Sequence, residues 1–162
     1  MEIVELLEKA VWFGFAGLGF GILFNVPLRS LTIIWILAAL GGLARNVLIL
    51  IGVDAIIATL LGAGLIGMAS IYAAHKKHAP PLVFSIPALI PMVPGVLGYR
   101  TMLGIMQLTG SVVDSDNYSE ILNQTISNGI NTLLITLTLA VGASIPLLAT
   151  RKVSAKNLKF KK

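Results

Sequence analysis

The chain has 162 residues, of which 56% are hydrophobic and 12% are charged, and its mean hydropathy is +0.91. A soluble globular domain carries roughly 25% charged residues, and one of this size cannot hide so much apolar surface from water. The composition therefore excludes a soluble globular protein and indicates an integral membrane protein. The chain contains no cysteine, so it has neither disulfides nor thiolate metal sites.

Five segments are long and apolar enough to cross a membrane, for which about 20 mostly apolar residues are needed. In chain order they are 10–28, 30–52, 55–74, 82–110 and 123–150. Only the second and fourth hold a charge within them, Arg45 and Arg100 respectively. The acidic start of the chain argues against a secretory signal peptide, and we expect a short interfacial helix over residues 1–9. The predicted fold class is all-α, with five transmembrane helices.

The basic residues are distributed unevenly between the two sides of such a five-helix arrangement. One of them lies on the side of the amino terminus, and nine lie on the opposite side: Arg29, Lys76, Lys77, Arg151, Lys152, Lys156, Lys159, Lys161 and Lys162. Because cytoplasmic loops collect Lys and Arg, we expect the amino terminus outside and the carboxyl terminus in the cytoplasm. The formal net charge of +5 is then a topology signal, and nucleic acid is not expected as a partner.

This arrangement predicts one transmembrane domain over residues 1–150, followed by a basic cytoplasmic tail over residues 151–162. The tail either contacts anionic membrane lipid or serves only as a topology anchor. Small residues four apart, the spacing at which membrane helices approach closely, predict contact faces in the first three helices. These pairs are Gly17 and Gly21, Ala38 and Gly42, and Ala63 and Gly67.

The fourth segment contains three prolines within eight residues, Pro87, Pro91 and Pro94, followed by Gly95 and Gly98. Each proline removes a backbone donor and clashes with the carbonyl four residues earlier, so we predict a helix broken near the middle of the bilayer. Irregular backbone at that depth is tolerated where protein buries it or water lines it. Transporters build substrate sites from such breaks, with freed backbone groups facing the ligand. A structural kink packed against neighbouring helices is the alternative interpretation.

The two arginines within the spans are costly, because an arginine at the bilayer centre costs roughly 2.5–3.5 kcal/mol on insertion scales. At about 1.5 Å per residue, Arg45 lies roughly 10 Å and Arg100 about 15 Å from the outer end of its span. No carboxylate lies within a span to pair with them, and a guanidinium binds carboxylates well. The pattern predicts a small carboxylate-bearing solute as substrate. Arg45 can alternatively snorkel to the surface.

Polar residues at helical spacing form a stripe in the outer half of the fifth span: Gln124, Ser127, Asn128 and Asn131. Such a stripe lines a water-filled path or holds helices together. No histidine, cysteine or acid lies within a span, which leaves no nucleophile–base pair and no metal-ligand cluster there. We therefore expect neither an enzyme nor a bound cofactor or metal.

The segment from Ile86 to Arg100, Ile-Pro-Ala-Leu-Ile-Pro-Met-Val-Pro-Gly-Val-Leu-Gly-Tyr-Arg, and the turn Phe-Asn-Val-Pro-Leu-Arg at 24–29 resemble the threonine/serine exporter family. The likeness covers nearly the whole chain and is to the second of two multi-span halves. It implies export of threonine and serine, or of a dicarboxylate such as succinate, together with a larger partner subunit that carries the first half. The family motif positions are Asn25, Pro27, Pro87, Pro91, Pro94, Gly95 and Tyr99. To these candidate substrate-site residues the chain's own pattern adds Arg45, Arg100, Asn128 and Asn131.

The sequence thus predicts a subunit of an exporter in the inner membrane of a prokaryotic cell, acting with a partner or as a homo-oligomer. An odd number of spans cannot hold an inverted pair of equal halves, so one chain is expected to be incomplete as an alternating-access device. Two alternatives stay open. One is a non-transporting component that stabilises or regulates another membrane protein, and the other is an oligomeric channel whose wall is the polar stripe.

Overall fold

The computed structural model describes residues 3–110 and 115–149, and the regular structure in those residues is entirely helical. In chain order the elements are α1 (Ile3–Leu23), α2 (Leu28–Leu50), α3 (Ala55–Lys77), α4 (Leu82–Leu89), the 3₁₀ helix η1 (Ile90–Met92), α5 (Gly95–Thr109) and α6 (Ser115–Ala149). Four of these helices are long and apolar enough to cross a membrane, and α4–η1 with α5 gives a fifth crossing if the bent pair is one span. The all-helical membrane architecture expected from composition is confirmed. The predicted tail over residues 151–162 lies outside the described residues.

The expected starts of two helices are wrong. The first residues do not form a separate interfacial helix, because α1 runs without interruption from Ile3 and already buries Leu6 and Ala10. The last helix begins at Ser115, eight residues before the predicted start, and continues for 35 residues. Hydropathy alone misplaced both starts, because a helix extends beyond its apolar segment wherever packing or polar residues still favour it.

Three of the turns between helices use the same capping geometry. Asn25, Gly52 and His78 adopt left-handed backbone conformations, at φ of 56°, 91° and 53°. In each case the backbone amide of the following residue donates to the carbonyl of the residue five positions before it, at 3.0–3.2 Å. This is the Schellman arrangement, which satisfies the last carbonyls of a helix and reverses the chain. It explains why α1 ends at Leu23 rather than continuing to the predicted residue 28.

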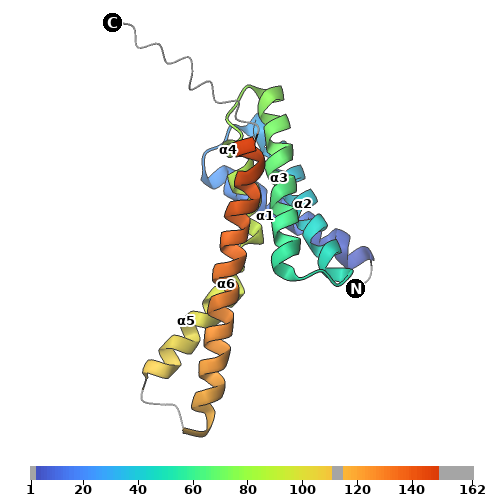
Figure 1. Ribbon diagram of the computed structural model, residues 1–162. Helices are drawn as coiled ribbons and strands as arrows, with labels where there is room; N and C mark the ends of the chain where they lie inside the picture. Colours follow the sequence, from blue (N-terminus) through green and yellow to red (C-terminus); the bar gives the residue numbers. More distant parts are fainter. Residues whose placement is uncertain (1–2, 111–114, 150–162) are drawn as a thin grey trace, which may run out of the picture.

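The helices form a bundle from which one hairpin extends (Figure 1). In the bundle α1 packs on α2, α2 on α3, and α3 on α6, while α4 contacts α1, α2 and α3. The main packing partner of α5 is α6. Figure 1 shows α5 and the amino-terminal half of α6, in yellow and orange, leaving the bundle together as a hairpin. We call this part the α5–α6 hairpin.

Small residues hold the bundle together at the positions that the four-residue spacing indicated. Gly17 approaches Ala38 of α2 so closely that an added Cβ would lie 2.6 Å from the alanine Cβ. At Gly67 of α3, an added Cβ would lie 2.9 Å from the Ala143 carbonyl oxygen of α6. Membrane helices gain stability from such close van der Waals contact.

The proline-rich segment is not one continuous helix. Val93 has extended backbone at φ −64° and ψ 132°, because a residue before proline is driven out of the α region. Pro94 has φ −79° and ψ 64°, and the Gly95 amide donates to the Val93 carbonyl at 2.8 Å, which is an inverse γ-turn. Across this turn α5 is bent by 54° from α4–η1. The bend directs α5 out of the bundle and into the hairpin.

Most of the segment before the turn is packed inside the bundle. Phe84, Pro87 and Met92 are among the largest fully buried side chains. Pro91 has no N–H to donate to the Pro87 carbonyl, and a Cβ on Gly17 would lie 3.6 Å from that carbonyl oxygen. Helix α1 therefore covers the freed backbone group, which matches the structural alternative of a kink packed against its neighbours.

Candidate functional site

The hairpin carries an open hollow of about 250 Å³ whose described lining residues come only from α5 and α6, with Arg100 itself exposed. Helix α5 contributes the guanidinium-bearing face, and α6 contributes amides and a hydroxyl. The lining residues are Arg100, Leu103, Gly104, Gln107, Ile121, Gln124, Thr125 and Asn128. Three amide side chains and one hydroxyl thus share this hollow with one cation. We call this the Arg100 hollow.

The helical spacing of α5 creates one wall of the hollow. Arg100, Gly104 and Gln107 are four and three residues apart, so they share a face of α5. Gly104 is the contact point with α6, because the Thr125 hydroxyl already occupies the space that a Cβ at Gly104 would need. A glycine at this position lets α5 approach α6 and brings Arg100 beside Asn128.

The polar groups around Arg100 differ in which of their donors and acceptors already make hydrogen bonds within the protein. Thr125 Oγ1 donates to the Ile121 carbonyl at 2.7 Å, so its proton is used within α6. Gln124 Nε2 donates to Glu120 Oε1 at 3.1 Å, which leaves the glutamine carbonyl oxygen available. Within the described residues Arg100 makes no hydrogen bond or ion pair. The site therefore holds an uncompensated cation, with a carboxylate one helical turn beyond its rim.

Arg45 lies elsewhere, at the junction of α2, α3 and η1. A Cβ at Gly62 would lie 3.3 Å from Arg45 Cβ and 2.9 Å from Met92 Cε, which places the three residues together. Arg45 Nε and the neighbouring Asn46 Nδ2 are buried, and neither atom has a hydrogen-bond partner among the described residues. The two arginines singled out in the sequence are therefore not brought into one hollow.

The family-motif residues are spread over two further places. Asn25 and Pro87 both line a mostly apolar hollow of about 390 Å³ beside the α1–α2 turn, together with Pro27. Pro91 in η1 and Pro94 in the γ-turn are half-buried and Gly95 is exposed, while Tyr99 has 65% of its surface exposed. None of the family-motif residues, all of which lie in the described part of the chain, lines the Arg100 hollow.

Of the polar stripe on α6, two members line the hollow and two do not. Gln124 and Asn128 face Arg100, whereas Ser127 and Asn131 are exposed and absent from its lining. The residue that sequence reasoning missed is Gln107. Its signal was present, since it is a polar residue seven positions after Arg100 on the same helical face.

Comparison with known proteins bears on what such a bundle does. The family model described as "Threonine/Serine exporter, ThrE" matches residues 9–149, which is most of the chain. The chain belongs to the threonine/serine exporter family. It is a member of a membrane exporter family, as the proline-rich segment and the Asn-Val-Pro turn indicated.

A relative from Haemophilus influenzae, described only as an uncharacterized protein, is 32% identical over 145 residues. The match covers 89% of this chain but 47% of the relative, so this exporter-family chain spans about half of that protein's length. No solved structure matches the chain. No solved structure therefore shows where a substrate would lie in a protein similar to this one.

Proposed function

We propose that this chain is a half-size subunit of an exporter for small carboxylate-bearing metabolites in the inner membrane of a prokaryotic cell. The observation that carries the proposal is the Arg100 hollow, in a chain that belongs to the threonine/serine exporter family. The Arg100 guanidinium would bind the substrate carboxylate, since charge-assisted hydrogen bonds to carboxylates are among the strongest in proteins. The amides of Gln107, Gln124 and Asn128 would bind its other polar groups.

The surroundings of the hollow favour an amino acid over a dicarboxylate as the substrate. A zwitterion such as threonine or serine needs an acidic or carbonyl group for its ammonium as well as a cation for its carboxylate. Gln124 connects the hollow to Glu120 through the 3.1 Å hydrogen bond, and its own carbonyl oxygen is available. A dicarboxylate such as succinate would bring its second charge towards Glu120, where like charges repel. We therefore propose threonine and serine as the preferred substrates.

The orientation proposed from charge sorting agrees with where the helix ends lie. In Figure 1 the amino terminus and the α2–α3 turn lie at the lower end of the bundle. The end of α3 with Lys76 and Lys77 lies at the upper end, together with the end of α6. With the basic end in the cytoplasm, the Arg100 hollow is on the outer half of the molecule.

We further propose that a partner supplies the other half of the exporter, either a larger subunit or a second copy. Two observations support this. The chain covers 47% of the Haemophilus relative, so that relative contains about as much again. The hairpin also leaves polar side chains such as Asn131 exposed on an apolar helix, where lipid offers them no hydrogen bond.

The test is efflux of labelled threonine, serine and succinate from cells or proteoliposomes that contain Arg100→Gln. Loss of one charge-assisted contact of roughly 1.5–3 kcal/mol predicts an increase in the substrate concentration for half-maximal efflux of about 10- to 150-fold. Arg29→Gln, an exposed arginine outside the hollow, is the matched control and keeps wild-type efflux. Membrane levels of both variants are measured in parallel. Wild-type efflux by Arg100→Gln at normal membrane level would contradict the proposed site.

Reconstitution separates the partner proposal from the alternatives. The chain alone in liposomes is expected to give no flux until a candidate partner is added. Saturable flux from the chain alone would instead identify a self-sufficient homo-oligomer, and non-saturable flux would identify a channel. A chain that supports no flux with any partner but stabilises one would be the non-transporting component.

A further inference from the structure

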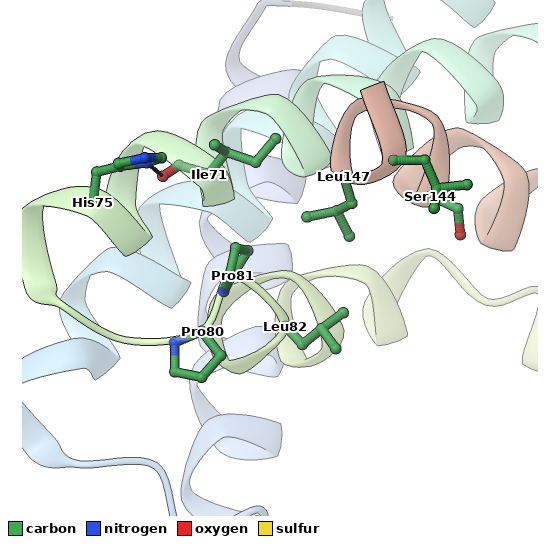
Figure 2. A pocket seen from close by; sticks show the side chains of 8 residues that line it. Ile71, His75, Pro80, Pro81, Leu82, Ser144 and Leu147 are labelled. Carbon is green, nitrogen blue, oxygen red and sulfur yellow. Dashed lines mark hydrogen bonds between the residues drawn. The ribbon is translucent and has the colours of Figure 1, made fainter. Parts of the chain in front are cut away.

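A second hollow lies at the basic end of the bundle, between the ends of α3, α4 and α6 (Figure 2). Its volume is about 470 Å³, within the range of roughly 300–1,000 Å³ that holds small-molecule ligands in proteins. The lining residues are Ile71, His75, Pro80, Pro81, Leu82, Ser144, Leu147 and Leu148. The walls are therefore mostly aliphatic, and a ligand must present hydrocarbon to them.

A more polar hollow of about 450 Å³ adjoins the first one at the chain reversal after α3. The two hollows share His75, Pro80 and Pro81, and the second adds His78 from the left-handed cap. An apolar space and a more polar space thus meet at one histidine. Such a pair matches a ligand that is itself amphipathic, with a hydrocarbon part and a polar part.

Two lysines lie in the chain next to the polar side of this arrangement. Lys76 and Lys77 follow His75 in the last turn of α3; both are exposed, and neither is part of the lining of the two hollows. His75 Nδ1 lies 2.8 Å from the Ile71 carbonyl oxygen, which can only accept, so Nδ1 donates this hydrogen bond. Figure 2 shows this imidazole at the rim of the hollow. The neighbouring Ser144 Oγ donates to the Ala140 carbonyl at 2.6 Å, so it offers an acceptor rather than a donor.

We propose that these joined hollows bind one anionic phospholipid from the surrounding bilayer. Its acyl chain lies between Leu82, Leu147 and Leu148, and its phosphate pairs with Lys76 and Lys77 beside His75. Basic pockets between transmembrane helices on the cytoplasmic side are where anionic headgroups bind. A water-soluble phosphate would meet the lysines but leave the apolar hollow unfilled, and a neutral lipid would fill the hollow but leave the lysines unpaired. The site is at the opposite end of the bundle from the Arg100 hollow, so it stands independently of the proposed transport function.

The experiment measures lipid retention by native mass spectrometry on the full chain, titrated with phosphatidylglycerol, phosphatidylcholine or inorganic phosphate. Phosphatidylglycerol is expected to bind with defined stoichiometry of one per chain, and phosphatidylcholine at least tenfold more weakly. In the variant Lys76→Gln/Lys77→Gln the affinity for phosphatidylglycerol falls roughly 20- to 30-fold, by the usual contribution of two basic residues beside an anionic headgroup. Arg29→Gln, at the same end but outside the hollow, leaves it within about twofold.

A pair of tryptophan variants on α6 tests the apolar part. Leu148 lines the hollow and is 64% exposed, while Leu137 lies three turns away and is 61% exposed. Leu148→Trp fills the space and is expected to lower phosphatidylglycerol retention at least fivefold, whereas Leu137→Trp is expected to leave it unchanged. Equal retention in these two variants would overturn the proposal, as would equal binding of phosphatidylcholine and phosphatidylglycerol. Binding of inorganic phosphate as tightly as of phosphatidylglycerol would show a simple anion site and would overturn it too.

Discussion

The contact between Gly104 and Thr125 is the feature on which the geometry of the Arg100 hollow depends. Replacing Gly104 by alanine would put its Cβ onto the Thr125 hydroxyl, with Thr125 Cβ at 2.9 Å and Cγ2 at 3.1 Å. Ordinary contact between such carbons needs 3.4–4 Å. Rotating the threonine does not relieve the clash, because its Cβ moves only with the backbone. Helix α5 must therefore move away from α6 by several tenths of an ångström or more.

The expected cost follows from comparison with a glycine in open space. Inserting a methyl group into a packed interface costs about 1–3 kcal/mol, and replacing a helical glycine by alanine returns about 1 kcal/mol of helix propensity. Gly19→Ala gains the same helix propensity but has no packing cost, because Gly19 lies inside α1 and an added Cβ there meets no atom within 4 Å. Gly104→Ala is therefore expected to be about 2 kcal/mol less stable than Gly19→Ala.

The assay is equilibrium unfolding of the purified chain in mild detergent, combined with efflux of threonine. Gly104→Ala should lower both the stability and the rate of efflux. The double variant Gly104→Ala/Thr125→Ala should regain at least half of the lost stability, because it removes the hydroxyl and the methyl group that clash. Equal stability of Gly104→Ala and Gly19→Ala would refute the described packing of α5 on α6. Failure of Thr125→Ala to rescue would show that the cost arises elsewhere.

Three further outcomes follow from the structure. A Cβ at Gly129 would lie 3.3 Å from Thr101 Cγ2, so cysteines at these two positions should form a disulfide on oxidation, detected as a gel shift that reductant reverses and that either single cysteine lacks. A membrane-impermeant maleimide added to intact cells should label Asp54→Cys but not Lys77→Cys, and the opposite pattern would invert the proposed topology. Glu120→Gln should reduce threonine efflux about five- to tenfold relative to succinate efflux, because a charge contact of roughly 1 kcal/mol or more to the ammonium is lost. An unchanged ratio of threonine to succinate efflux would contradict the proposed ammonium contact.

Hydropathy predicted the ends of a helix well where they depend on the length of its apolar segment. The second and third helices, α2 and α3, begin and end within three residues of the predicted segments, because the bilayer requires a fixed length of apolar chain. The ends that were misplaced depend on conformation rather than polarity. Asn25 closes α1 through a left-handed backbone conformation, and the sequence indicates this end by an asparagine two residues before a proline rather than by hydropathy.

The candidate site was predicted only in part, for a different reason. The sequence indicates that Arg45 and Arg100 are both costly in lipid, but it holds no information on their lateral separation. That separation results from the 54° bend at Pro94 and from the fit of Gly104 against Thr125. Helical spacing placed Asn128 and Gln124 on one face, yet the position of α5 decides which members of the stripe face a cation. Contacts between helices distant in the chain are set by such pairwise fits, which no single-helix pattern contains.

The length of α6 has a consequence for where solute would leave the protein. Its 35 residues extend about 52 Å at 1.5 Å per residue, whereas the hydrocarbon core of a bilayer is about 30 Å thick. Even at a tilt of 40°, the upper end of the observed range, the helix projects roughly 40 Å along the membrane normal, so about 10 Å of it emerges into the headgroup region. Counted from Ala149, Gln124 lies 25 residues or about 37 Å along the helix, which projects about 29 Å along the normal at that tilt, close to the far edge of the hydrocarbon core. In the proposed orientation Arg100 thus lies near the outer edge of the hydrocarbon core, where a carboxylate bound to it would meet water as it leaves.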